Sequence, residues 1–315
     1  MKELHEAHQW SISCLCKVLE LPRCSYYKWL NRKETKEELE NHELAQLILE
    51  YDERFNHILG YRRMTRWINK LNSKHYNRKR VRRLMKLLGV KSIIRKKREK
   101  YESTAPEISA ENVLSRNFNA TKPNEKWTTD VTEFKVAGTK QKLYLSAILD
   151  LYDRSVVSYE ISTRNDNSLV FRTYEEAVKS NPGATPLLHS DRGFQYTSKV
   201  FQTKLGKAGI RQSMSRVGRC IDNGPTEGFW GIIKSEMYYL KKYDSLEELR
   251  EDIIQYIHFY NYERLQERFD DRTPMAVRIA ALTAENVAQY PIKENKRIQK
   301  YYANLKSKQE QYSIA

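Results

Sequence analysis

The chain has 315 residues, of which 40% are hydrophobic and five are Trp, so it is long enough for two or three domains with their own cores. No apolar run approaches the roughly 20 residues of a membrane span, and the first thirty residues carry charges throughout. Four cysteines make no disulfide framework. These features exclude a membrane protein and a disulfide scaffold, and they predict a cytoplasmic location.

The net charge of +16 is concentrated in one segment. Between Arg54 and Lys100 there are eighteen Lys or Arg and one acidic residue, Glu99, so this segment carries +17 and the rest of the chain −1. A surface that only keeps a protein soluble usually mixes signs, whereas here one sign predominates and aromatic residues are interleaved. The segment therefore favours contact with nucleic acid, and association with the nucleoid, over a merely solubilising pair of helices.

Residues 1–55 are expected to form an N-terminal helical region. Within residues 9–31, apolar side chains recur at helical spacing on both sides of Pro22. The two short helices fit a small helix-turn-helix or, equally well, a pair that docks on the amphipathic helix expected over residues 34–55. A zinc site is not favoured, because the spacing is too tight for a usual structural site among His5, His8, Cys14 and Cys16.

Residues 56–100 are expected to form a DNA-binding domain. Apolar residues keep helical spacing over 61–71 and again from residue 78, where Asn77 is a suitable N-cap. Two amphipathic helices joined by about five residues fit a helix-turn-helix that reads DNA. The basic run at residues 95–100 would contact phosphates without reading sequence. The candidate DNA contacts in this domain are Arg62, Arg63, Arg78, Arg80 and Arg83.

The rest of the chain is expected to hold a linker, a catalytic core and a tail. Residues 101–125 are polar, contain two prolines and keep no periodicity, which is typical of a linker. Over residues 126–282 we expect a strand ending at Asp130, a hydrophobic hairpin, a helix, a strand before Asp191 and further helices. This order predicts an α/β domain in which a mixed sheet is flanked by helices. Residues 283–315 are interpreted as a basic amphipathic tail that binds DNA or a partner protomer.

Three carboxylates lie where a sheet can bring them together. Asp130 is placed at the end of the strand-like run KWTTDVT, Asp191 follows the apolar run PLLHS, and Glu227 lies at the start of a helical pattern. Their oxygens suit Mg²⁺ or Mn²⁺, and such a site is what two-metal phosphoryl transfer needs. Lys234 follows Glu227 by seven residues, two turns along the same helix face, where it would hold a DNA phosphate or be an ordinary exposed lysine.

Other carboxylates compete for this role, because a lone Asp at a strand end is more often a cap or turn residue than a ligand. Asp153 is explained by the turn of the hairpin and Asp222 by a cap before the helix. Glu236 lies on the opposite side of the helix from Glu227. Asp150, on the hairpin, stays open as an alternative on the residues alone.

The three acids and their surroundings resemble the DDE transposase and retroviral integrase superfamily. The resemblance is carried by NFNATKPNEKWTTDVTEF, LLHSDRGFQYTS, DNGPTEGFWGIIKSEMY and YIHFYNYERLQERFDDRTPMAVR. Upstream, LGYRRMTRWI and NRKRVRRLMKLLGV resemble the helix-turn-helix that precedes the core in the second-frame (OrfB) transposases of bacterial insertion-sequence family three. The chain departs from the family pattern at Gly224, where Ala is frequent, and at Gln266, where many members have His.

This resemblance implies an RNase H-like catalytic core in which Asp130, Asp191 and Glu227 are the catalytic triad and bind two Mg²⁺ ions, with Mn²⁺ as a substitute. It also implies that Lys234 contacts DNA. The expected reaction is metal-dependent DNA cleavage and strand transfer at the terminal inverted repeats of an insertion sequence, with target DNA as the second substrate. The expected partners are a second copy of the chain, or more, on DNA and an upstream-frame protein.

Two other functions are compatible with parts of the sequence. A non-catalytic DNA-binding regulator would use the same basic helices but would need none of the three acids. An RNase H-like nuclease without strand transfer would use the acids to cleave but would not join ends. The two differ from a transposase in whether a free 3′-hydroxyl end is joined to a second DNA.

Overall fold

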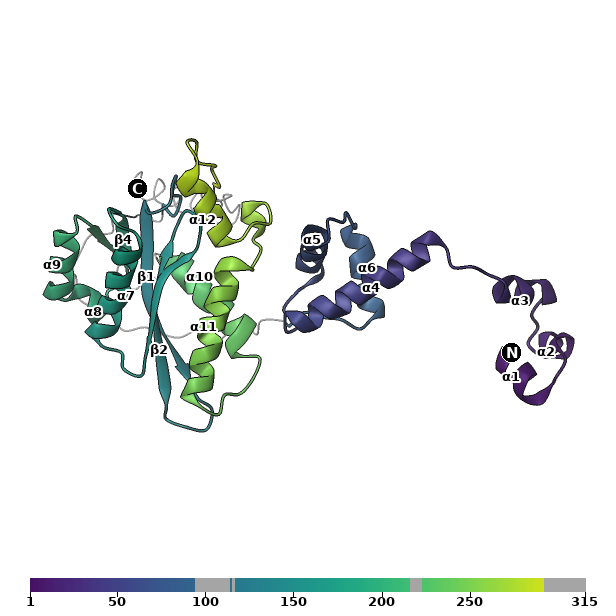
Figure 1. Cartoon of the computed structure of the whole chain (residues 1–315). Helices are drawn as coiled ribbons and strands as arrows, with labels where there is room; N and C mark the ends of the chain where they lie inside the picture. The colour runs from purple at the N-terminus through teal and green to yellow at the C-terminus, as the bar shows by residue number, and fades with distance from the viewer. Residues whose placement is uncertain (94–113, 115–116, 216–222, 292–315) are drawn as a thin grey trace, which may run out of the picture. The chain divides into compact units, whose positions relative to one another are not determined.

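The computed structural model describes residues 1–93, 114, 117–215 and 223–291 (Figure 1). The chain divides into two compact units, Met1–Ile94 and Arg95–Ala315. The basic run predicted at residues 95–100, most of the linker at 101–125 and most of the tail at 283–315 lie outside the described residues. None of the described helices combines the length and the hydrophobicity that crossing a membrane requires.

In its described residues, the first unit contains helices joined by short connections and no strands. The predicted break at Pro22 is confirmed, and so are the two basic amphipathic helices, of which the second starts at the predicted cap, Asn77. Seven residues at the N-terminus form an additional helix that the sequence did not indicate, because none of its side chains is buried. The helices are α1 (Lys2–His8), α2 (Ile12–Val18), α3 (Arg23–Leu30), α4 (Lys36–Arg54), α5 (Tyr61–Leu71) and α6 (Arg78–Leu87).

Helices α4, α5 and α6 pack on one another around a small apolar core. Leu44 and Ile48 of α4 and Met64 and Ile68 of α5 are completely buried, and so is Val81 of α6. Each of these side chains occupies the apolar face that helical spacing predicted. The basic residues are thereby left on the remaining faces, as an amphipathic pattern requires.

The second unit contains a five-stranded mixed sheet with the strand order β3-β2-β1-β4-β5. β1, β2 and β3 are antiparallel neighbours, which confirms the predicted hairpin, whereas β4 runs parallel to β1 and β5 parallel to β4. The predicted α/β class is thereby confirmed. The strands are β1 (Lys126–Lys135), β2 (Lys142–Asp150), β3 (Val156–Ser162), β4 (Leu187–Ser190) and β5 (Arg211–Met214).

Helices cover both faces of this sheet (Figure 1). On one face, α10, the π-helical turn η2 and α11 pack on buried side chains of β2 such as Leu145 and Leu149. On the other face, α7 and α9 pack against Trp127, Ile148 and Leu188. The helices are α7 (Asn167–Ser180), α8 (Phe194–Thr197), α9 (Lys199–Lys207), α10 (Gly224–Ile233), η2 (Lys234–Tyr238), α11 (Leu246–Tyr262), the 3₁₀ turn η3 (Glu267–Phe269) and α12 (Pro274–Thr283).

The position of Asp130 in its strand corrects the sequence prediction. Asp130 was expected to close its strand at a sheet edge, but β1 continues to Lys135 and is the central strand. The physical reason is that β1 stays paired with β2 beyond this point, with Asp130 opposite Ala147. Only its parallel neighbour β4 ends near the level of Asp130.

Candidate active site

Asp130 and Asp191 come together where β4 leaves the sheet. β4 pairs in parallel with β1 up to Thr128 and His189, and Asp130 and Asp191 follow these two residues by two positions each. Because side chains two residues apart point to the same face, this register directs both carboxylates to one side. Their proximity has an electrostatic consequence: the negative charge of Asp191 raises the pKa of Asp130.

Two donors from different elements hold the Asp130 carboxylate. The backbone N–H of Val131 donates to Oδ1 at 2.8 Å, and Nε1 of Trp230 on α10 donates to Oδ2 at 3.0 Å. Burial is the largest cause that raises the pKa of Asp130, the charges of Asp191 and Glu227 act in the same direction, and the two hydrogen bonds oppose them. Trp230 was not among the residues predicted from the sequence, although its position three residues after Glu227, one turn along the helix, was a usable signal.

Asp191 begins the turn after β4, and Glu227 begins α10. The Asp191 Oδ1 atom accepts a hydrogen bond from the Gly193 N–H at 2.9 Å, and burial raises the pKa of Asp191 against the effect of this bond. A Cβ atom at position 193 would lie 3.0 Å from Gln195 Oε1 and 3.1 Å from Asp191 Oδ1, so any larger residue would fit tightly in this turn. Glu227 lies in the first turn of α10, its side chain reaches solvent, and a partial loss of hydration from the neighbouring groups raises its pKa.

The donor chemistry of these acids fits a divalent cation. Each of the three has a raised pKa, and a nearby positive charge favours the ionised form of a carboxyl group. The three are not drawn into a closed cage, since no group of three or more His, Cys, Asp or Glu side chains in the described ranges is placed to hold a metal ion. Asp130 and Asp191 thus form the assembled part of the site, with Glu227 on the adjacent helix.

Lys234 lies on the predicted face of the Glu227 helix, at the junction between α10 and η2. Its Nζ atom donates to Thr132 Oγ1 at 2.6 Å and lies 5.2 Å from the centroid of the Phe134 ring. Thr132 follows Asp130 by two residues and shares its face of β1. Through Thr132, the Lys234 ammonium group is therefore held against β1 close to Asp130.

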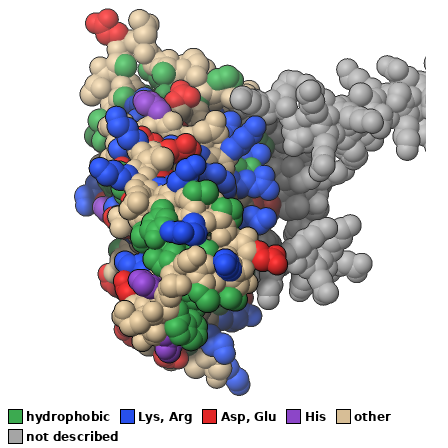
Figure 2. Space-filling view, turned by 90° about the vertical axis from the view of Figure 1, so that its right-hand side faces the viewer, with side chains coloured by type: hydrophobic (Ala, Val, Ile, Leu, Met, Phe, Trp, Pro, Cys, Tyr) green, Lys and Arg blue, Asp and Glu red, His purple; other side chains and the backbone are tan. Residues whose placement is uncertain are grey.

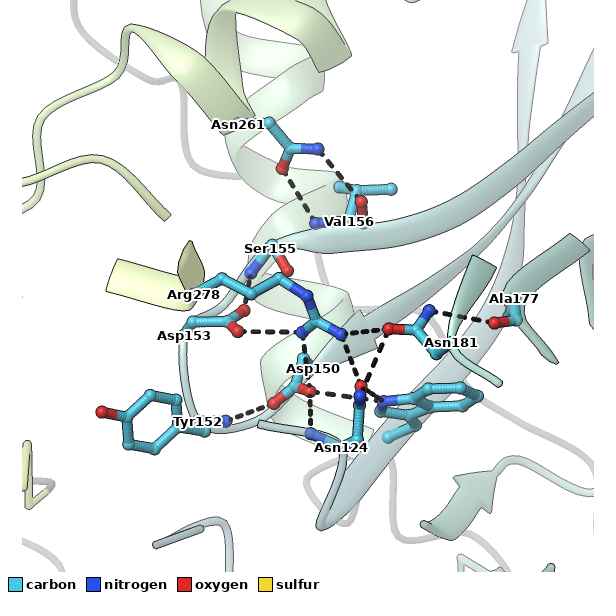
Figure 3. A network of polar contacts seen from close by, with 11 residues as sticks. Asn124, Asp150, Tyr152, Asp153, Ser155, Val156, Ala177, Asn181, Asn261 and Arg278 are labelled. Carbon is cyan, nitrogen blue, oxygen red and sulfur yellow. Dashed lines mark hydrogen bonds and ion pairs between the residues drawn. The ribbon is translucent and has the colours of Figure 1, made fainter. Parts of the chain in front are cut away.

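A buried network around Arg278 accounts for Asp150, the rival that the residues alone left open (Figure 3). Arg278 Nη1 donates to Asp150 Oδ2 at 3.0 Å and to Asp153 Oδ2 at 2.9 Å, and both carboxylates are completely buried. Asp150 also accepts hydrogen bonds from the backbone N–H groups of Asn124 and Tyr152. These partners give Asp150 a structural role and separate it from the three acids.

The remaining rivals are also explained where they are described. Glu236 forms a two-point ion pair with Arg264, at 2.8 and 3.0 Å, and accepts a hydrogen bond from the Tyr256 hydroxyl. Its carboxylate therefore points toward α11 and away from Glu227, as helical spacing predicted. Asp222 lies outside the described residues.

Arg80, one of the predicted DNA contacts, has partners within the first unit. Its Nε atom donates to Asn41 Oδ1 at 2.8 Å and its Nη1 atom to Glu40 Oε2 at 3.0 Å, and both partners lie on α4. The guanidinium therefore fastens α6 to α4, an internal role that helical spacing cannot reveal. The exposed members of the predicted set are Arg62, Arg78 and Arg83.

Arginines also surround Tyr61 at the start of α5. The Arg62 Nε atom donates to the Tyr61 hydroxyl at 3.2 Å, and the Cζ atom of Arg82 lies 5.3 Å from the centroid of the tyrosine ring. These contacts with Arg62, and the charges of Arg82 and Arg78, lower the pKa of Tyr61. Arg63 is half-buried, and its Cζ atom lies 5.3 Å from the centroid of the Trp67 ring, one turn further along α5. Figure 2 shows Lys and Arg side chains spread over the face that it views, interspersed with hydrophobic ones.

The mixed sheet with paired acids, together with the basic helices, defines a class: DNA-binding proteins with an integrase-type core. Residues 120–220 and 227–282 match the family described as "Integrase core domain", and residues 38–98 match the family described as "HTH-like domain". Among solved structures, the HTLV-2 integrase catalytic core domain in complex with magnesium is similar with a TM-score of 0.39 and 23% identity, over 49% of this chain and 95% of that one.

The particular family follows from the relatives of the whole chain. The chain is 39% identical, over 88% of its length and 97% of the other, to the putative transposase InsK for insertion sequence element IS150 of Escherichia coli K12. It is 29% identical, over 81% and 88% of the two lengths, to transposase InsF for insertion sequence IS3A of the same organism. The chain belongs to the DDE transposases of insertion-sequence family three, OrfB type, which are polynucleotidyl transferases with an RNase H-like core.

Proposed function

We propose that Asp130, Asp191 and Glu227 are the catalytic acids of this transposase and hold two divalent ions, Mg²⁺ with Mn²⁺ as a substitute. The observation that carries this proposal is the parallel register of β1 and β4, which brings Asp130 and Asp191 to one side, beside the helix α10 that begins with Glu227. Burial and repulsion both disfavour two ionised carboxylates in one place, so a cation between them stabilises the ionised pair. Glu227 supplies the third carboxylate from the helix that packs on β1.

When bound, the ions supply activation of the attacking water or DNA 3′-hydroxyl and stabilise the leaving 3′-oxygen. The task of the chain is to hold its carboxylates in fixed orientations, and Lys234 adds a positive charge for a DNA phosphate on the same strand face. No covalent protein intermediate is required. Ser190, which precedes Asp191, is not expected to act as a nucleophile, because it is buried and its hydroxyl donates to the backbone carbonyl of Asp191.

The same proposal assigns the DNA-binding unit and its partners. Helices α4–α6 act together, since Arg80 binds α6 to α4, and their exposed arginines contact phosphates of the terminal inverted repeats. The core then acts on the repeat end and on target DNA. Because transposition joins two ends, the working assembly is a homodimer or a larger complex on DNA, with an upstream-frame protein as a further partner.

A strand-transfer assay tests the proposed reaction. The purified full chain is incubated with DNA that carries one end of the surrounding insertion sequence, either intact or already cleaved to a free 3′-hydroxyl, and with a second DNA. We expect Mg²⁺ or Mn²⁺ to support joining of the cleaved end, and chelation to abolish it. Cleavage without joining would identify a nuclease, and binding without either reaction would identify a regulator.

Exposed and internal arginines are expected to respond differently to neutralisation. Arg83→Gln should weaken DNA binding and lower the dependence of log affinity on log salt by up to about one slope unit, because one phosphate contact is lost. Arg80→Gln should leave that slope unchanged and lower the free energy of unfolding by about 1 kcal/mol. Fluorescence anisotropy over a salt series and urea denaturation measure the two effects. An equal loss of slope in both variants would place Arg80 at the DNA.

A further inference from the structure

Hydrogen bonds from α10 and η2 to β1 form a ladder that fixes the helix along the strand. Its donors recur every four residues and therefore lie on one helix face, and its acceptors follow one another along a single strand. This ladder sets the position of the helix that carries Glu227 relative to the strand that carries Asp130. The rungs join Trp230 to Asp130 (3.0 Å), Lys234 to Thr132 (2.6 Å) and the Tyr238 hydroxyl to the backbone carbonyl of Lys135 (2.7 Å).

The Trp230 rung is the one that touches a proposed catalytic acid. The indole is 7% exposed and packs in the apolar core between the sheet and α11, so its orientation is fixed by its surroundings. Trp230 also follows Glu227 by one helical turn. We propose that Trp230 is a positioning residue for strand transfer, whose N–H orients the Asp130 carboxylate and holds the Glu227 helix against β1. This proposal rests on the proposed role of Asp130.

An indole N–H suits this task for a chemical reason. It donates one hydrogen bond and carries no charge, so it orients a carboxylate without neutralising it, as Arg or Lys would. The ionised carboxylate has about four acceptor positions, and the bonds from Val131 and Trp230 leave others for a cation. Val131 belongs to the same strand as Asp130 and moves with it. Trp230 is thus the donor that relates Asp130 to α10.

Metal binding by the full chain tests this proposal without relying on activity alone. The rise in Tm on addition of Mn²⁺ is measured for the wild type, Trp230→Phe, Tyr238→Phe and Asp130→Asn. We expect Trp230→Phe to need about 10- to 100-fold more Mn²⁺ for the same rise, as is typical when a partner of a metal ligand is lost. Tyr238→Phe removes a different rung and should respond like the wild type. The strand-transfer kcat should fall in Trp230→Phe while the Kd for the DNA end, measured without metal, stays unchanged.

Each outcome separates the positioning role from the proposed function. A normal Mn²⁺ response in a folded Trp230→Phe, with the response lost in Asp130→Asn, would overturn the role of Trp230 and leave the catalytic acids in place. A normal response in Asp130→Asn would overturn both proposals. If Trp230→Phe does not fold, benzothienylalanine at position 230 keeps the bicyclic shape and has sulfur in place of the N–H, and the same weakening is then expected.

Discussion

Asp191→Asn is expected to bind the transposon end normally and to cleave and join it at least about a thousand-fold more slowly, a loss equivalent to several kcal/mol of transition-state stabilisation. The substitution keeps the shape of the side chain and removes one of the two charges that meet where β4 leaves the sheet. Its Oδ1 atom can still accept the Gly193 N–H, so the local turn is retained. Single-turnover cleavage and joining, with end binding measured separately, test the expectation. Wild-type rates in this variant would contradict the assignment of the three acids as catalytic residues.

Asp191→Asn is also expected to keep or raise the Tm in metal-free buffer, whereas a variant that misfolds would lower it. Burial and the charge of Asp191 both raise the pKa of Asp130, so the two ionised carboxylates destabilise each other without metal. Asp191→Asn should therefore have a Tm equal to or above that of the wild type in metal-free buffer, and a reduced rise with Mn²⁺. Glu133→Gln is the matched control, because this β1 carboxylate pairs with Lys135 and Lys142 outside the site. It should change neither activity nor metal response.

Most of the helices and strands could be predicted, because the spacing of apolar residues along the sequence indicates which side chains are buried. The hairpin is rich in apolar residues on both sides of the turn at Asp153, and α5 and α6 place their apolar residues on one face. Asp191 directly follows a short apolar strand, so its position at a strand end was readable. Asp130 was not, because the length of β1 depends on its pairing with β2, and the single-strand pattern around Asp130 does not show how far that pairing extends.

Individual roles depended on partners that no local pattern contains. Arg80 looks like any other arginine of a basic helix, yet its partners Glu40 and Asn41 lie about forty residues upstream. Trp230 looks like an ordinary core residue of α10, and its hydrogen bond to Asp130 spans a hundred residues. Asp150 had the context of a possible ligand until Arg278 was placed beside it. Sequence thus identifies candidate acids and bases, whereas the fold decides which of them face one another.

Arg278→Met is expected to lower the free energy of unfolding by about 3–5 kcal/mol, the usual effect of removing one partner from a buried ion pair. Met retains much of the length and the apolar stem of the side chain, so the change isolates the guanidinium. Without it, Asp150 and Asp153 remain as two buried carboxylates whose shared countercharge is gone. Arg278 also donates to the Asn181 side chain, at 2.6 Å, so the link from α12 to the end of α7 is lost as well.

A matched surface substitution distinguishes this effect from the loss of any arginine. Arg172 forms an exposed ion pair with Glu160, at 3.4 Å, and Arg172→Met should cost less than about 1 kcal/mol. Adding Asp153→Asn to Arg278→Met should recover part of the lost stability, because one of two repelling charges is removed. Urea denaturation of the single and double variants gives this coupling. Equal stability of Arg278→Met and the wild type would contradict the structural role of the network.

The instability of Arg278→Met is expected to depend on pH in a defined direction. Burial raises the pKa of Asp150, the charge of Asp153 raises it further, and Arg278 opposes both, so removal of Arg278 raises the pKa again. A carboxyl group with a higher pKa in the folded state binds more protons when folded, and stability therefore falls as pH rises above the unfolded pKa of about 4. The variant should lose more stability relative to the wild type at about pH 8 than at about pH 5.5. A deficit that is the same at both pH values would mean that lost packing, and not the unpaired carboxylates, causes it.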